Sequence, residues 1–439
     1  MKYSVITFGC RVNQADSLGF EEQLRAAGAQ PAPPETADVV VVNTCSVTAT
    51  ADQGARQTIR RVARSNPRAR IVVTGCYATR RPDDVRGLPG VVGVVHNDDK
   101  PRLLQILGGV GRAALSTAER FGDGDGSCGA SIEPGVAGRT AFTLRVQTGC
   151  AEPCAYCIIP VTRGRPRSAP IDSLIGEVER VAAAGFKEIA LTGVHLGSYG
   201  RDLTPRSSLI ELLRAFERHR SIPREPDSQS RSVRLEPDLL FRISSLEPMD
   251  CSREVVDIVA ECEAFAPHFH LPLQHASDRI LAVMRRPYTV EEYAALVDGI
   301  RARIPAASIG SDIIVGFPDE TDDDFEQLAS YLGGSPLTHI HVFPYSDRPG
   351  TAASAMSGKV PGAVVRERGR VVRDIGQRLA TKFRESQVGT VRRGLTLEDG
   401  SLVVTDNYLK VKIPPGRVRN EWVRVKISSV GDPMRGELP

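Results

Sequence analysis

The sequence of 439 residues predicts an α/β protein that begins with a doubly wound parallel sheet and ends with a small all-β barrel. In the first part, short β-branched runs alternate with helical patterns, which is typical of a parallel sheet. The runs are apolar throughout, as expected for strands buried on both faces. A second series of six alternations occupies the middle of the chain, and the last part changes to the period-two pattern of half-buried strands.

Each of the three apolar runs that predict the N-terminal sheet ends in a cysteine: YSVITFGC at 3–10, VVVVNTC at 39–45 and IVVTGC at 71–76. Helical patterns at 17–27 and 49–64 separate them. Parallel strands present their carboxyl ends at one edge, where open α/β folds bind ligands. Cys10, Cys45 and Cys76 are therefore predicted to meet there. The competing interpretation is three separate buried thiols, which behave as small hydrophobic residues.

The central alternation is predicted from strands and helices of ordinary length. The strands lie near 142–148, 188–193, 240–246, 267–273, 309–316 and 339–345. The helices lie at 171–184, 209–219, 253–263, 290–304 and 322–331. A Gly/Asp/Ser-rich segment at 108–139 is typical of a linker. The polar, proline-containing segment at 220–237 is longer than a typical connection and predicts an exposed insertion.

A second group of thiols, Cys150, Cys154 and Cys157, has the spacing C-x3-C-x2-C. Three thiolates within eight residues can hold one iron–sulfur cluster and leave one iron without a protein ligand. A zinc site would usually bring several C-x2-C pairs or added histidines, and no histidine occurs between His96 and His195. A disulfide framework requires secretion, and no apolar signal segment begins the chain. The other three cysteines, interpreted as ordinary thiols, are Cys128 in the linker and Cys251 and Cys262 on an apparent helix.

Composition, with 41% hydrophobic and 25% charged residues, is typical of a globular protein. No apolar stretch approaches the roughly 20 residues of a membrane span, so we expect no membrane association. Because no signal peptide is recognised, we expect a reducing, cytoplasmic compartment. Because the net charge is only +3, nucleic-acid binding has to be inferred from local clusters. Two such clusters are Arg56, Arg60, Arg61 and Arg64 on a helix, and Lys410, Lys412, Arg424 and Lys426 on two strands. Each cluster could equally be a solvated face.

The cysteine triplet, with an aromatic residue before its last member, resembles the radical S-adenosylmethionine (SAM) enzymes. Two open cysteine trios in one chain resemble the methylthiotransferases of that superfamily over nearly the whole sequence. The matching segments are TFGCRVNQ at 7–14, VNTCSVT at 42–48, LTGVHLGSYG at 191–200, RISSLEP at 242–248, SDIIVGFP at 311–318 and HVFPYS at 341–346. They are closest to the tRNA enzymes acting on N6-threonylcarbamoyladenosine. LPLQHASD at 271–278 is as similar to enzymes that modify a ribosomal-protein aspartate.

The resemblance implies two 4Fe-4S clusters and SAM as cofactors. In the family, one cluster binds and cleaves SAM to a 5′-deoxyadenosyl radical, and the other carries the transferred sulfur. Cys150, Cys154 and Cys157 match the first, and Cys10, Cys45 and Cys76 the second. Tyr156 matches the aromatic residue near cluster and adenine, and Gly193 the backbone that approaches the methionine group. Glu247 and Gly316 fall at strand ends where barrels place ligand contacts. The alternatives are core packing for Tyr156 and strand capping for Glu247 and Gly316.

The resemblance also implies the function: 2-methylthiolation of N6-threonylcarbamoyladenosine in the anticodon loop of tRNA. A reducing protein is expected as electron donor, whereas the sulfur donor is not identified by the sequence. Alternatives are methylthiolation of a ribosomal-protein aspartate or of N6-isopentenyladenosine, and a catalytically inactive RNA-binding protein. All six ligand cysteines are present, which disfavours the last.

The sequence patterns give the domain boundaries, and the resemblance implies the identities of the domains. We expect a methylthiotransferase domain at 1–107, the linker at 108–139, a partial (β/α)6 radical SAM barrel at 140–363, a basic helical connector at 364–387 and a TRAM-like β-barrel at 388–439.

Overall fold

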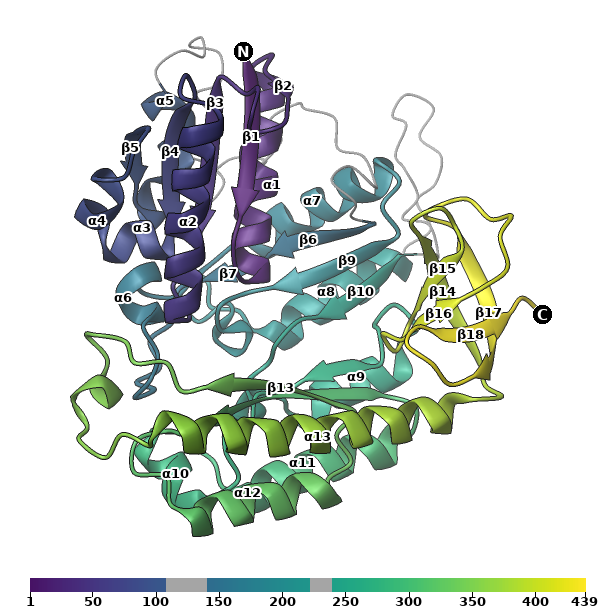
Figure 1. The fold of residues 1–439 in the computed structure, drawn as a ribbon. Helices are drawn as coiled ribbons and strands as arrows, with labels where there is room; N and C mark the ends of the chain where they lie inside the picture. Colours follow the sequence, from purple (N-terminus) through teal and green to yellow (C-terminus); the bar gives the residue numbers. More distant parts are fainter. Residues whose placement is uncertain (108–139, 222–238) are drawn as a thin grey trace.

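The computed structural model describes residues 1–107, 140–221 and 239–439. The predicted linker at 108–139, with Cys128, lies outside these residues, as does the predicted insertion from residue 222 onward. The N-terminal sheet stands above a curved central layer of strands, and the long helix α13 leads along one side to a C-terminal barrel (Figure 1). Among the described helices, none combines the length and the apolar run that crossing a membrane would require.

The N-terminal sheet has five parallel strands in the order β2-β1-β3-β4-β5. The strands are β1 (Lys2–Thr7), β2 (Gln30–Pro31), β3 (Val39–Thr44), β4 (Arg70–Gly75) and β5 (Val91–Val95). The helices are α1 (Arg11–Ala26), α2 (Ala49–Ser65), α3 (Cys76–Arg80), α4 (Pro82–Arg86), α5 (Leu103–Ile106) and the 3-10 turn η1 (Asn97–Arg102). The predicted parallel, doubly wound sheet is confirmed, because α1 and α5 pack on one face, and α2, α3 and α4 on the other.

Helix α1 begins at Arg11, six positions before the predicted start at 17. Its first turns bury Asn13 and Asp16, which are polar. The apolar periodicity that marks a helix is therefore missing over these turns, although their inner face is covered.

The central strands are all parallel and form the predicted partial barrel. They are β6 (Ala141–Arg145), β9 (Glu188–Thr192), β10 (Leu240–Ile243), β11 (His268–His270), β12 (Ser308–Val315) and β13 (His339–Pro344). Two three-stranded sheets, β10-β9-β6 and β11-β12-β13, are connected by parallel bridges from Phe241 to Phe265 and from Ser245 to His270. All six predicted strands are confirmed. The first predicted strand, 142–148, is divided into β6 and β7 (Gln147–Thr148), because β7 leaves the parallel sheet and pairs antiparallel with β8 (Arg167–Ser168).

The barrel helices are α6 (Ile159–Arg163), α7 (Ile171–Ala183), α8 (Leu209–Ser221), α9 (Arg253–Glu261), α10 (Asp278–Val283), α11 (Val290–Arg303) and α12 (Asp322–Gly334). Short 3-10 turns are η5 (Leu196–Ser198), η6 (Pro248–Asp250) and η7 (Ala352–Ala355). The prediction that Cys251 and Cys262 lie on a helix is wrong, because Cys251 lies two residues before α9 and Cys262 directly follows its last residue. Ser252 caps the helix by accepting a hydrogen bond from the Val255 amide, which fixes its start after Cys251.

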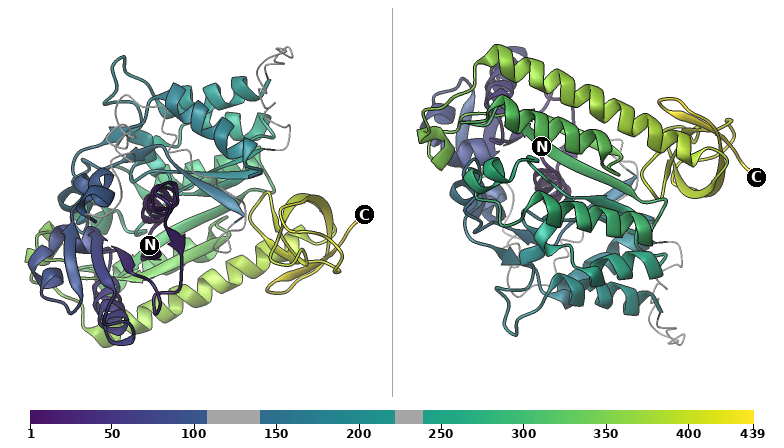
Figure 2. Two further views of the ribbon diagram at one scale, coloured as in Figure 1. Left: turned by 90° about the horizontal axis from the view of Figure 1, so that it is seen from above. Right: turned by 90° about the horizontal axis from the view of Figure 1, so that it is seen from below.

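Helix α13 (Gly362–Gln387) leads to a closed five-stranded barrel. The barrel strands, in the order β14-β15-β16-β18-β17, are β14 (Val391–Leu397), β15 (Leu402–Thr405), β16 (Lys410–Lys412), β17 (Trp422–Ser429) and β18 (Met434–Glu437). Figure 2 shows this barrel at the far end of α13. The predicted alternation is confirmed: Lys410, Lys412, Arg424 and Lys426 are exposed, whereas the valines between them are buried.

Candidate functional site

The three strand-end cysteines lie at one edge of the N-terminal sheet. Cys10 is the N-cap of α1, Cys45 follows β3 directly and Cys76 begins α3. Their strands β1, β3 and β4 are adjacent and parallel. Burial, reinforced by the neighbouring thiols of Cys10 and Cys76, raises the pKa of Cys45 to about 11. The structure thus brings the three predicted thiols together.

Two glycines allow this close approach. Gly9 has φ +88°, and a Cβ at this position would lie 2.5 Å from the Cys45 sulfur. Gly75 has φ +96°, and its Cβ would lie 2.2 Å from the Thr44 carbonyl oxygen. Any other residue would strain the backbone and push the strand ends apart.

Cys76 lies among cations and donors from both neighbouring parts of the chain. Burial alone would raise the pKa of its thiol, but Arg163 and Lys100 outweigh that effect and lower the pKa. The side-chain nitrogen Nδ2 of Asn97 lies 3.7 Å from the Cys76 sulfur and donates a hydrogen bond to the Thr162 carbonyl oxygen at 2.7 Å. This environment favours the thiolate, which is the form that binds iron.

The triplet Cys150, Cys154 and Cys157 lies in the loop between β7 and α6. Gly149 begins the loop at φ +76°, where a Cβ would lie 2.0 Å from the Arg165 carbonyl oxygen. Burial raises the pKa of Cys157 to about 12 and that of Cys154 as well. Arg286 opposes the shift at Cys154, because its Nη1 lies 3.2 Å from that sulfur.

Both trios fit the clusters that the family resemblance implies. All eight described cysteines are free thiols, so none of the six is committed to a disulfide within the described residues. Cationic side chains lie against one sulfur of each trio, Arg163 at Cys76 and Arg286 at Cys154. Such cations offset part of the charge that a thiolate set gathers.

A buried ion network that the sequence did not reveal joins the N-terminal sheet to the barrel. Asp16 of α1 pairs with Lys100, Arg145 and Arg163, and the contact to Arg163 is 3.2 Å. Arg163 also donates to the Asn13 side-chain oxygen at 2.5 Å. Burial would raise the pKa of Asp16, but the three cations outweigh burial and lower it. Because Arg163 ends the helix that follows the cysteine triplet, the network fixes one trio relative to the other.

Replacing Asp16 with alanine should lower the free energy of unfolding by about 3–5 kcal/mol, because Lys100 and Arg163 would stay buried without their carboxylate. Urea unfolding of the full chain measures this change. As the pKa of folded Asp16 is depressed, its stabilisation is complete above the unfolded value of about 3.9 and is lost as the pH falls through the folded pKa. D374N, which breaks an exposed pair with Arg370, is the control and should leave the urea midpoint unchanged. If D16A and D374N had the same urea midpoint, the buried ion network of Asp16 would not stabilise the fold.

A second buried junction is built around Asp52 of α2. Its carboxylate accepts hydrogen bonds from Ser46 at 2.9 Å and from Arg348 of the barrel at 2.9 Å, and it also pairs with Arg80. Arg348 is almost fully buried. The Asp52 carboxylate therefore ties the loop that carries Cys45 and Ser46 to Arg348 of the barrel.

The other predicted SAM contacts have structural neighbours of their own. The Tyr156 ring meets Phe317 edge-on at 6.5 Å. Glu247 pairs with Arg286, which also contacts Cys154. A Cβ on Gly193 would lie 2.8 Å from Leu196, and one on Gly316 would lie 2.3 Å from Val365 of α13. Close packing would by itself explain a glycine at either position, and the four SAM contacts stay predictions.

A cavity of about 660 Å³ lies where the three parts of the chain meet. Cys10 and Arg11 line it from the N-terminal part, Gly193 and Asp312 from the barrel, and Tyr408 from the C-terminal barrel. Of the ten predicted site residues, Cys10 and Gly193 are the two in this lining.

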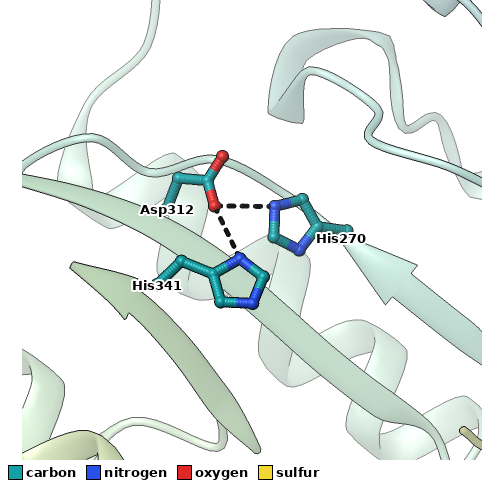
Figure 3. Close-up of side chains that lie close together, drawn as sticks. All are labelled: His270, Asp312 and His341. Carbon is teal, nitrogen blue, oxygen red and sulfur yellow. Dashed lines mark hydrogen bonds and ion pairs between the residues drawn. The ribbon is translucent and has the colours of Figure 1, made fainter. Parts of the chain in front are cut away.

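Four histidines on the flanking strands β11 and β13 also line the cavity, and sequence reasoning missed them. Both strands contain the sequence His-x-His, and residues two apart on a strand point to the same face, so this pattern could have predicted that the histidines lie together. His270 Nε2 and His341 Nδ1 donate to the same oxygen of Asp312 on β12, at 3.0 and 3.1 Å (Figure 3). These two bonds outweigh burial and lower the pKa of Asp312, and the carboxylate in turn raises that of His341. Two imidazoles and a carboxylate are a possible donor set for a transition metal, but here they satisfy one another.

The predicted arginine cluster on α2 is divided. Arg60, Arg61 and Arg64 are exposed. Arg56 instead donates to the Tyr77 hydroxyl at 3.0 Å. Three of the four arginines are thus exposed to solvent, and their role as phosphate contacts stays a prediction.

Two family models match the chain. Uncharacterized protein family UPF0004 matches residues 2–96, and the Radical SAM superfamily matches residues 144–332. Among solved structures, the radical S-adenosylmethionine methyltransferase TsrM from Kitasatospora setae has a TM-score of 0.57 at 17% identity, covering 80% of this chain and 76% of that one. That likeness shows the fold.

Relatives in sequence extend the match to the whole chain. Threonylcarbamoyladenosine tRNA methylthiotransferase MtaB from Aquifex aeolicus is 36% identical over 97% of this chain and 100% of its own length. The protein of the same name from Bacillus subtilis is 33% identical, over 97% and 94%. A tRNA-2-methylthio-N(6)-dimethylallyladenosine synthase from Leifsonia xyli is 32% identical, over 88% and 70%. With such relatives matched almost from end to end and two cysteine trios on adjoining parts of the fold, the chain belongs to the radical SAM methylthiotransferase family.

Proposed function

We propose that the protein replaces the hydrogen on C2 of N6-threonylcarbamoyladenosine in tRNA with a methylthio group. The observation that carries this proposal is the match to four relatives named threonylcarbamoyladenosine tRNA methylthiotransferase, at 31–36% identity over at least 94% of this chain. The two cysteine trios and the cavity between the folded parts support it.

In this proposal each trio holds one 4Fe-4S cluster: Cys150, Cys154 and Cys157 in the barrel, and Cys10, Cys45 and Cys76 in the N-terminal sheet. When bound, the clusters supply the electron that cleaves SAM and a place for the sulfur to be transferred. The chain itself contributes thiolates, the cations beside them and the ion networks that fix the two trios relative to each other.

The cavity fits an unpaired base taken out of an RNA loop. Its volume of about 660 Å³ falls within the roughly 300–1,000 Å³ of small-ligand sites. Bases extruded from a loop are held by stacking on aromatic faces and by contacts to their edges. The histidines of β11 and β13 and the ring of Tyr408 offer such faces, and Arg11 and Asp312 offer edge contacts.

Substrate choice can be tested with anaerobically reconstituted protein, SAM, a reductant and three substrates. These are anticodon stem-loops carrying N6-threonylcarbamoyladenosine or N6-dimethylallyladenosine, and a ribosomal-protein peptide with the target aspartate. Mass spectrometry should find the methylthio product on the first. The dimethylallyl substrate is the second candidate because a relative of that activity matches 88% of this chain. Faster modification of either other substrate would overturn the proposal.

The exposed lysines of the C-terminal barrel should contact the RNA backbone. Tyr408 reaches the cavity, and β16 leads away from it with Lys410 and Lys412 on its outer face. The double variant K410A/K412A should bind tRNA more weakly, and the slope of log K against log salt should flatten by about 1.5, equivalent to two phosphate contacts.

Fluorescence anisotropy over a series of salt concentrations measures this slope. The matched control, R218A/R253A, removes two exposed cations from the outer helices α8 and α9. If K410A/K412A and the control had the same slope as the unmodified protein, the lysines would be a solvated strand surface.

A further inference from the structure

Arg11 lies directly beside the proposed N-terminal cluster site. It follows Cys10 in the chain, begins α1 and lines the cavity with a half-buried side chain. Any group that approaches Cys10 through the cavity therefore meets a guanidinium, which is always cationic.

The other two arginines of the cavity wall are neutralised by carboxylates. Arg163 pairs with Asp16 at 3.2 Å, and Arg384 pairs with Asp432 at 2.9 Å. The Arg11 guanidinium instead donates to the Tyr408 hydroxyl at 3.1 Å. Among the described residues no carboxylate pairs with it, so its charge is available to a ligand.

Tyr408 holds Arg11 toward the cavity from a different part of the chain. It lies in the turn between β15 and β16 with φ +70°, a left-handed conformation that bulky residues rarely adopt and that is often found at functional sites. Its ring centre lies 4.6 Å from the Arg242 guanidinium and 4.8 Å from the His268 ring centre. Arg242 also donates to the Asp406 carbonyl at 3.0 Å, which anchors the same turn to the barrel.

The proposed substrate brings an anion to this place. In adenine, C2 and C6 are both bonded to N1, so a substituent on N6 lies on the same edge of the base as C2. If C2 faces Cys10, the N6 substituent extends beside Cys10 as well. The threonylcarbamoyl group ends in a carboxylate, whereas a dimethylallyl group is neutral and apolar. Guanidinium groups bind carboxylates through paired, charge-assisted hydrogen bonds.

We infer that Arg11, positioned by Tyr408, binds the threonyl carboxylate of the modified adenosine and so determines which N6 substituent the cavity accepts. This specificity role rests on the proposed function and adds a named contact to it. A glutamine or other uncharged residue at position 11 would lose the preference for an anionic substituent.

Binding of RNA to the reconstituted full-length protein, without SAM and hence without turnover, tests this inference. Three anticodon stem-loops are compared by fluorescence anisotropy: one with unmodified adenosine, one with N6-threonylcarbamoyladenosine and one with its methyl ester, which removes the negative charge. The parent protein should prefer the threonylcarbamoyl RNA to the other two by about tenfold, or about 1.4 kcal/mol.

R11Q should lose this preference while its affinity for the unmodified RNA stays within about twofold, and R11K should keep part of it. Y408F, which removes the acceptor of Arg11 but keeps the ring, should show an intermediate preference. The control R253Q, on the outer helix α9, should match the parent. Iron content, measured for each variant, verifies that the cluster beside position 11 is intact.

The outcomes separate this inference from the proposed function. If the parent prefers the threonylcarbamoyl RNA and R11Q keeps that preference, the inference is wrong and the proposed function stands. If R11Q weakens all three RNAs equally, Arg11 is a phosphate contact and the inference is again wrong. If the parent neither prefers nor modifies the threonylcarbamoyl RNA, the proposed function itself fails.

Discussion

Replacing Cys154 with alanine should abolish SAM cleavage. A site-differentiated cluster needs all three thiolates of the triplet, because one of its irons already lacks a protein ligand. The variant should still fold, since Arg286, which contacts the Cys154 sulfur at 3.2 Å, keeps its ion pair with Glu247. Formation of 5′-deoxyadenosine by the anaerobically reconstituted protein measures the cleavage, and it should fall to background.

Iron analysis distinguishes loss of the cluster from loss of activity alone. The parent protein should carry about eight irons, and C154A about four, if each trio holds one 4Fe-4S cluster. Cys262 provides the control because it is also a partly buried free thiol of the barrel but lies outside both trios. C262A should keep the full iron content and activity. A C154A protein that still produced 5′-deoxyadenosine at the parent rate would refute the role of the triplet.

The fold could be predicted because its signals are local. β3 is buried at every position, and its sequence, VVVVNT, is apolar except at the end. That end is where Cys45 follows, so one short segment predicts both a central strand and a ligand position. The same holds for β1 with Cys10 and β4 with Cys76, and parallel pairing then brings the three together without further information.

The contacts that join the parts could not be predicted, because they connect residues distant in sequence. Asp16 and Arg163 are 147 positions apart, and Arg11 and Tyr408 are 397 apart. The sequence around these residues contains no pattern that would indicate which of them contact each other. Gly316 is a case in which a local signal has two explanations: its place at a strand end predicts a ligand contact, and its tight packing against Val365 of α13 would by itself exclude a side chain there.

Replacing Cys45 with alanine should stop methylthio transfer but leave SAM cleavage intact. In C45A, the cysteine triplet and its contact with Arg286 are unchanged, because they lie in the barrel. We therefore expect 5′-deoxyadenosine to form without the methylthio nucleoside, and iron content to fall by about half. The expected loss of product is complete, because Cys45 lies beside both other thiols of its trio, Cys10 and Cys76, and its loss leaves the proposed cluster with two ligands.

The control for C45A is C251A, because Cys251 is buried to the same degree, with 4% of its surface exposed against 5% for Cys45. Both substitutions remove one buried sulfur and so carry a similar packing cost, but only C45A touches a proposed ligand. C251A should therefore make the methylthio product at nearly the parent rate. Full product formation by C45A would exclude a sulfur-carrying cluster at this edge. Loss of 5′-deoxyadenosine together with product would instead show that cleavage at the barrel trio depends on an intact N-terminal trio.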